Sequence, residues 1–128
     1  MKLYYSPGAC SLSPHIALHE AGLAFTAVKA PTKTHKLDDG TDYYSINPLG
    51  YVPLLELDDG TRLTEGPAIV QYLADQVPDK KLAPPAGSFE RVRLQEKLLD
   101  QHSQSQTRSH LSRAQEREQL RHLPVRIF

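Results

Sequence analysis

The order of strand and helix signals in the first 80 residues constrains the fold more than any other feature. Residues 2–5 form a short aromatic strand that runs into a Ser-Pro-Gly turn. Ser13-Pro14 has the chemistry of a helix start, with Ser as N-cap and Pro at the first helical position. The helix is expected to end at Gly22, and residues 24–28 form a second strand. Because about 20 residues separate the two strands, a helical crossover and parallel pairing are expected.

The following segment predicts a hairpin and a second helix. Residues 52–57 and 61–64 are apolar runs joined by an Asp-Asp-Gly turn, which is a strong hairpin signal. The second helix begins near Gly66 and ends before Pro78, and a short helical turn is expected around 42–46. The order β-α-β, then β-β-α, indicates an α/β domain with the thioredoxin-like layout, a central four-stranded sheet with helices on its faces.

Composition and charge exclude several classes of protein. Lys+Arg and Asp+Glu are 15 each, so no global basic field favours nucleic acid or an anionic membrane as a partner. No apolar run approaches the roughly 20 residues that span a bilayer, and no secretory signal is visible. The single cysteine, Cys10, excludes an internal disulfide framework and a multi-cysteine metal site. We therefore expect a cytoplasmic protein.

The composition changes abruptly after Leu99. Residues 1–99 hold 10 Lys+Arg against 12 Asp+Glu, whereas residues 100–128 hold 5 Arg against 3 acids. The stretch 100–110 has no apolar side chain and cannot offset its ordering entropy by burial. A basic RNA-binding arm is the alternative, but its arginines are sparse and Phe128 is its only aromatic. The predicted organisation is a domain at 1–80, a linker at 81–87, a helix at 88–99 and a polar tail at 100–128, helical at most over 114–123.

Three runs of sequence resemble the bacterial beta-class glutathione S-transferases. They are MKLYYSPGACSLSPHIAL at 1–18, NPLGYVP at 47–53 and LTEGPAIVQYLAD at 63–75, in the order and spacing of the family. The resemblance covers about residues 1–98 and implies a thioredoxin-like, glutathione-binding N-terminal domain. The family continues with an all-helical domain, which nothing after Leu99 resembles, so we expect a reading-frame shift or a misassembled gene end there.

The resemblance also implies an activity, the conjugation of the glutathione thiolate to a small electrophile. Glutathione is then a substrate, and no cofactor or metal is expected. The family forms homodimers, but its helical domain supplies much of the dimer contact and of the electrophile pocket. We therefore expect weak or no transferase activity from this chain. The alternatives are a non-catalytic glutathione-binding module and glutaredoxin-like thiol–disulfide exchange through Cys10.

Cys10 is the first candidate catalytic residue. It lies three residues before the predicted helix start, where unpaired N–H groups and the positive end of the helix dipole favour a thiolate. The resemblance implies that Cys10 holds the glutathione sulfur by a hydrogen bond or a mixed disulfide. The alternative is a small, inert core cysteine. Tyr5 and Ser11 are alternates, because other classes of the superfamily use a Tyr or a Ser near these positions to stabilise the glutathione thiolate. Tyr5 is better explained as an aromatic residue of the first strand. Ser11 is explained equally well as a residue at the helix start and as a second donor.

The remaining candidates concern glutathione binding. The family carries a cis proline at Pro53, and the resemblance implies that the main chain of Val52 pairs with the cysteinyl part of glutathione. The alternative is a trans proline that starts a strand. Glu65 is expected to meet the γ-glutamyl ammonium and the Gly66 N–H its carboxylate, since Gly66 opens a helix. Alternatively, Glu65 only complements the helix dipole.

The loop that contains His35 is the last candidate region. His35 matches the lysine with which the family often meets the glycine carboxylate of glutathione, and Lys33 and Lys36 are close substitutes. A solvated charged loop is the alternative. His15 and His19 lie four residues apart, which is metal-ligand spacing, but no further ligand accompanies them and no zinc site is predicted.

Overall fold

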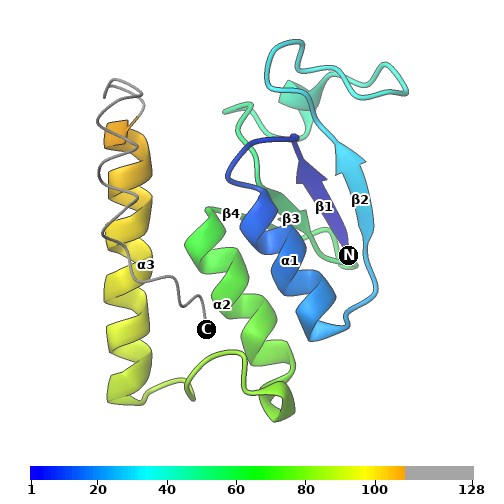
Figure 1. Ribbon diagram of the computed structural model, residues 1–128. Coiled ribbons are helices and arrows are strands. Elements are labelled where there is room, and N and C mark those ends of the chain that lie inside the picture. The colour runs from blue at the N-terminus through cyan, green and yellow to red at the C-terminus, as the bar shows by residue number, and fades with distance from the viewer. Residues whose placement is uncertain (109–128) are drawn as a thin grey trace. The chain divides into compact units, whose positions relative to one another are not determined.

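The first compact unit of the chain is a four-stranded sheet covered by helices (Figure 1). The structure is a computed structural model that describes the backbone of residues 1–108 and the side chains of residues 1–101. The chain divides into two units, Met1–Ala83 and a second that begins at Pro84. The elements of the first unit are β1 (Lys2–Tyr5), α1 (Leu12–Ala21), β2 (Thr26–Lys29), η1 (Tyr43–Ser45), β3 (Leu54–Glu56), β4 (Arg62–Thr64), α2 (Gly66–Gln76) and η2 (Pro78–Lys80).

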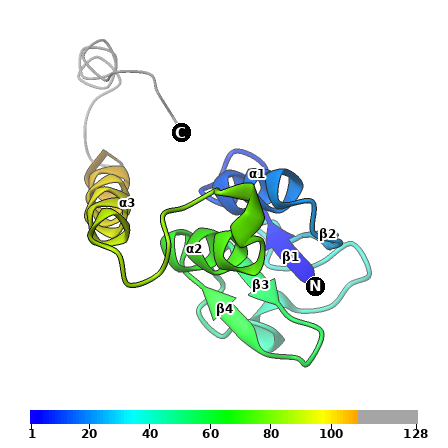
Figure 2. The same ribbon diagram turned by 90° about the horizontal axis from the view of Figure 1, so that it is seen from below.

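The sheet has the strand order β2-β1-β3-β4. β1 pairs in parallel with β2, and Lys2 lies opposite Thr26, so the predicted helical crossover is confirmed. β3 is antiparallel to both β1 and β4, which confirms the hairpin. α1 and α2 lie side by side on one face of the sheet (Figures 1 and 2). The carboxyl end of β1 therefore leads directly into the helix layer.

Alternate residues of β1 and β3 supply two separate cores. Leu3 and Leu55, paired across the strands, are fully buried against Leu18 of α1 and against Ile69 and Leu73 of α2. The side chains of the next paired residues, Tyr4 and Leu54, point to the opposite face of the sheet, because side chains alternate along a strand. There they pack with buried side chains of the 30–52 segment in a cluster that comprises Tyr4, Ala30, Leu37, Tyr43, Val52 and Leu54.

The ends of α1 differ in how well the sequence predicted them. Gly22 is the C-cap with φ +66°, as predicted, and its N–H contacts the His19 carbonyl. The predicted start at Ser13-Pro14 is wrong, because the helix begins at Leu12 with Ser11 as its N-cap residue. The first helical N–H groups need no intrahelical acceptor, so Pro14 is tolerated in the third position. β2 also begins two residues later than predicted, whereas η1 confirms the helical turn around 42–46.

The second unit contains α3, which spans Phe89–Arg108. The expectation that this helix ends near Leu99 is wrong. Its hydrogen bonds are local and the segment holds no Gly or Pro, so the loss of apolar residues does not end it. The helix predicted at 114–123 lies outside the described residues. Within residues 1–108, no helix has the length and apolar character needed to cross a membrane.

The core on the helix side of the sheet predicts the cost of truncating Leu55. Leu55→Ala is expected to lower the free energy of unfolding by about 2–5 kcal/mol, because it leaves a cavity between the sheet and two helices. Leu49→Ala is the matched control, since Leu49 is 69% exposed, and it should change stability by less than about 0.5 kcal/mol. Urea denaturation followed by circular dichroism measures both. Equal losses for the two variants would contradict the assignment of the core.

Glu56 is held by two cations from neighbouring strands. Arg62 Nε lies 3.0 Å and Lys2 Nζ 3.3 Å from its carboxylate oxygens. Partial burial raises the pKa of Glu56, but the hydrogen bonds from Arg62 and Lys2 outweigh it and the net pKa is lowered. A lowered pKa in the folded state stabilises the fold above the ordinary value of 4.5, and the contribution is lost as the pH falls through the folded value.

Glu56→Gln is therefore expected to have a pH-dependent effect. At pH 7 it should lower the free energy of unfolding by about 1 kcal/mol or less, because both cations are solvent-accessible. As the pH falls through the lowered pKa of Glu56, the difference from wild type should shrink, since the wild-type carboxyl then also becomes neutral. Denaturation curves at pH 3 and pH 7 test this. A difference that grows at the lower pH would contradict the assigned ion pairs.

Candidate functional site

The structure brings Cys10 to the residue that precedes Pro53. Cys10 lies in the turn between β1 and α1, two residues before the helix begins, and is exposed. Its thiol donates a hydrogen bond to the Val52 carbonyl oxygen across 3.3 Å. The Val52–Pro53 peptide bond is cis, as predicted. The turn after β1 and the residues just before β3 therefore lie in contact and form one candidate site.

The main chain of Val52 offers a donor as well as an acceptor. Val52 is buried, with 8% of its surface exposed. Its carbonyl contacts Cys10, whereas its N–H has no hydrogen-bond acceptor among the described residues. Buried N–H groups without a partner are rare in native proteins. This N–H is consequently available to an external acceptor.

Ser11 and Tyr5 occupy different surroundings from Cys10. The Ser11 hydroxyl is buried, accepts from the Ser6 N–H and donates to the Ser6 carbonyl, each at 3.1 Å. It closes the turn that carries Cys10. The half-buried Tyr5 ring packs against His15, with ring centroids 5.4 Å apart.

His15 and His19 form an aromatic cluster with Phe25. Their rings stack at 5.2 Å, and the edge of Phe25 meets both. In the described part of the chain, no group of three or more His, Cys, Asp or Glu side chains could hold a metal ion.

Glu65 and Gly66 lie together at the start of α2. Glu65 has φ +69° and ψ +114°, a backbone conformation that residues other than glycine rarely adopt. Such conformations are often found at functional sites. Gly66 begins the helix and Pro67 follows, so the Gly66 N–H belongs to the donors that a helix start leaves without an intrahelical acceptor.

His35 is held in a compact loop. Its ring lies 4.4 Å from that of Tyr44, measured between centroids, and both rings pack against Gly50. The His35 Nδ1 atom is buried and has no hydrogen-bond partner among the residues described. Lys33 and Lys36, on either side in sequence, are exposed. The loop therefore presents three basic side chains, of which only the histidine is fixed by packing.

Sequence reasoning missed two residues next to this site, Tyr43 and Asn47. The Tyr43 hydroxyl and the Asn47 side-chain amide both donate to the Tyr51 carbonyl, at 2.9 and 2.8 Å. Both side chains are buried, with 0% and 5% of their surface exposed. A large aromatic inside a polar loop, followed by an Asn-Pro turn, was the available signal.

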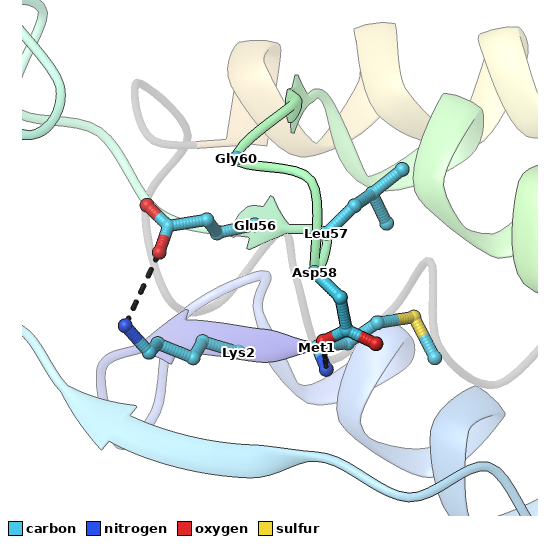
Figure 3. Close-up of a pocket in the computed structure, with 6 residues that line it drawn as sticks. All are labelled: Met1, Lys2, Glu56, Leu57, Asp58 and Gly60. Atoms are coloured by element: carbon cyan, nitrogen blue, oxygen red, sulfur yellow. Dashed lines mark hydrogen bonds and ion pairs between the residues drawn. The ribbon is translucent and has the colours of Figure 1, made fainter.

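A cavity of about 200 Å³ lies at the other end of β1 (Figure 3). In it Lys2 pairs with Glu56, and the Met1 amino group with Asp58. Its charged groups thus neutralise one another. The cavity is lined by Met1, Lys2, Glu56, Leu57, Asp58 and Gly60, and none of the candidate site residues is among them.

Comparison with known proteins identifies the class of protein to which this sheet and site belong. The family model of the glutathione S-transferase N-terminal domain matches residues 8–76. Over 93 residues the chain is 55% identical to glutathione S-transferase GstA of Escherichia coli O157:H7, a match that covers 73% of this chain and 46% of the relative. The chain belongs to the glutathione S-transferase N-terminal domain family.

Solved structures agree with this assignment. BphK, a bacterial GST solved as a ternary complex, is 67% identical with a TM-score of 0.75. The beta-class enzyme of Sphingomonas chungbukensis is 57% identical with a TM-score of 0.74, and a sphingomonad enzyme complexed with glutathione is 54% identical with a TM-score of 0.73. Each match covers 77% of this chain and 49% of the other. The predicted thioredoxin-like fold and beta-class resemblance are confirmed, and the chain spans about half the length of these relatives.

The packing of two rings against Gly50 predicts a large effect of a methyl group there. In Gly50→Ala the new Cβ would lie 2.7 Å from Tyr44 Cε1 and 3.0 Å from the His35 ring, whereas Gly40 has nothing within 4 Å. Both glycines have positive φ, so Gly40→Ala is the matched control for backbone strain. Gly50→Ala should be less stable than Gly40→Ala by about 1–3 kcal/mol, which is the cost of overpacking. Thermal denaturation measures this, and equal stability of the two variants would contradict the ring packing.

Proposed function

We propose that this chain binds glutathione and directs its sulfur to a small electrophile. The observation that carries the proposal is the 3.3 Å contact between Cys10 Sγ and the Val52 carbonyl, with the unpartnered Val52 N–H beside it. A residue that offers one main-chain donor and one main-chain acceptor can pair with the main chain of an extended peptide. Family membership and the glutathione named in a relative's structure support the tripeptide as that ligand.

Each end of glutathione has a proposed partner. The cysteinyl residue pairs with the main chain of Val52 at Pro53. The γ-glutamyl ammonium meets the carboxylate of Glu65, and its carboxylate meets the N–H of Gly66, where the helix dipole also favours a negative charge.

The glycine carboxylate of the tripeptide is assigned to the basic loop. His35 is its first partner, because packing against Tyr44 holds the ring in place. Lys33 and Lys36 are exposed and can add attraction at the rim, where solvent weakens each contact.

The proposed chemistry is nucleophilic substitution by sulfur. The glutathione thiol loses its proton to solvent, the thiolate attacks the electrophilic carbon, a C–S bond forms, and a halide leaves with the electron pair of the broken bond. When glutathione binds, Cys10 is proposed to turn its S–H from the Val52 carbonyl to the glutathione sulfur and to stabilise the thiolate by that hydrogen bond, since electrostatic stabilisation of charge is a major source of catalysis. Tyr5 is the alternate donor, and Ser11 is proposed to support the turn rather than the sulfur, because its hydroxyl bonds Ser6.

Thiol–disulfide exchange is the second candidate, favoured by the exposure of the Cys10 thiol. In that reaction the Cys10 thiolate attacks the glutathione sulfur of a mixed disulfide: a new S–S bond forms, the original S–S bond breaks, and the other sulfur leaves as a thiolate that takes a proton from solvent. A non-catalytic glutathione-binding module would use the same candidate site without either reaction. A homodimer in the cytoplasm completes the proposal, and Phe89, Val92 and Leu99, exposed along α3, support self-association of the second unit.

Two assays on one preparation separate these functions. Conjugation of a chromogenic aryl halide and reduction of a glutathione mixed disulfide are measured for wild type and for Cys10→Ala. Conjugation that falls about tenfold or more in the variant, without disulfide reduction, is the expected result, because one charge-assisted hydrogen bond is lost. Disulfide reduction alone supports exchange, and calorimetric binding without turnover supports the module. No glutathione binding by wild type would refute the proposed function.

A further inference from the structure

The unpartnered Val52 N–H belongs to a peptide group whose other end is held by two donors. The Tyr51 carbonyl oxygen accepts from the Tyr43 hydroxyl at 2.9 Å and from Asn47 Nδ2 at 2.8 Å. A trans peptide group is planar, with its C=O and N–H in opposite directions. Fixing the Tyr51 carbonyl therefore also fixes the direction of the Val52 N–H, which points away from both donors.

The two donors are themselves held firmly. The Tyr43 N–H donates to the His35 carbonyl at 2.7 Å, and the Asn47 N–H donates to the Tyr43 carbonyl at 2.8 Å. Asn47 Oδ1 accepts from the Leu49 N–H at 3.2 Å, so the orientation of its amide group is determined. Burial raises the pKa of Tyr43, so its hydroxyl remains a donor at neutral pH.

We propose that Tyr43 and Asn47 are positioning residues for glutathione, holding the 51–52 peptide so that the Val52 N–H donates to the cysteinyl carbonyl of the tripeptide. This inference rests on the proposed function. The two hydrogen bonds at the Tyr51 carbonyl also polarise the peptide group and strengthen its N–H as a donor. Neither side chain touches the ligand, and both act through one peptide plane.

Tyr43→Phe is the main test, because it removes one hydroxyl and keeps a ring in the buried cluster. Tyr4→Phe is the matched control: Tyr4 is buried in the same cluster, with its ring 5.7 Å from that of Tyr43, and its hydroxyl does not bond Tyr51. The first readout is the Val52 amide proton in a ¹H–¹⁵N correlation spectrum of the ligand-free, full-length chain. We expect this resonance to move upfield in Tyr43→Phe and to stay near its wild-type position in Tyr4→Phe.

The second readout is affinity measured by calorimetry. Tyr43→Phe should weaken glutathione binding by about three- to tenfold, the typical effect of one hydrogen bond, while Tyr4→Phe binds as wild type does. A glutathione analogue with an alkene in place of the cysteinyl–glycine amide lacks the acceptor carbonyl. Its affinity should be the same for wild type and for Tyr43→Phe, which a merely structural defect would not produce.

Asn47→Asp provides a second variant, since it keeps the acceptor for Leu49 but replaces the donor to Tyr51 by an oxygen. Asn47→Asp should weaken the binding of glutathione more than the binding of the analogue. Equally weakened binding of both ligands, or an unmoved Val52 resonance in Tyr43→Phe, would overturn the positioning role. If wild type bound no glutathione, the proposed function would fail and this role with it, whereas normal wild-type binding with unchanged variants would overturn the positioning alone.

Discussion

The alternation of side chains along β1 and β3 is the constraint on which the rest of the structure depends. Leu3 and Leu55 bind the helix layer to one face, while Tyr4 and Leu54 bind the 30–52 segment to the other. A shift of one residue in the pairing would exchange the two faces and expose both cores. The register therefore also decides where the chain leaves β1 and where it enters β3, and those two points carry Cys10 and Val52.

Tyr43 connects the second core to the site. Its ring is fully buried in the cluster beneath the sheet, while its hydroxyl reaches the carbonyl of Tyr51. The hydrophobic burial of one side chain thus determines the direction of a peptide group that a ligand would use. Packing energy and recognition are coupled through this residue, because a buried phenol needs a hydrogen-bond partner and finds it in the main chain.

The candidate site retains groups that have no partner among the residues the structure describes. The N–H of Val52 is one, and the start of α2 at Gly66 is another. Val52 is buried, and a donor that folding removes from water without an acceptor costs about 1–3 kcal/mol, so the fold is less stable at this point than it could be. A ligand that satisfies these donors recovers that free energy on binding, which is a physical reason for such groups to mark a binding site.

Local chemistry in the sequence determined the elements and much of the candidate list. Gly22, the Asp-Gly turn and the Gly-Pro helix start act over a few residues, and the motif resemblance supplied Cys10, Pro53 and Glu65. Local signals were weakest at element ends, as at Ser13-Pro14, where the helix begins earlier, and beyond Leu99, where the helix continues through a sequence that holds few apolar residues. Only the tertiary structure decided that Cys10 contacts Val52 and that Tyr43 and Asn47 hold the Tyr51 carbonyl. Those contacts depend on strand register and loop closure, which are set by packing across the whole domain.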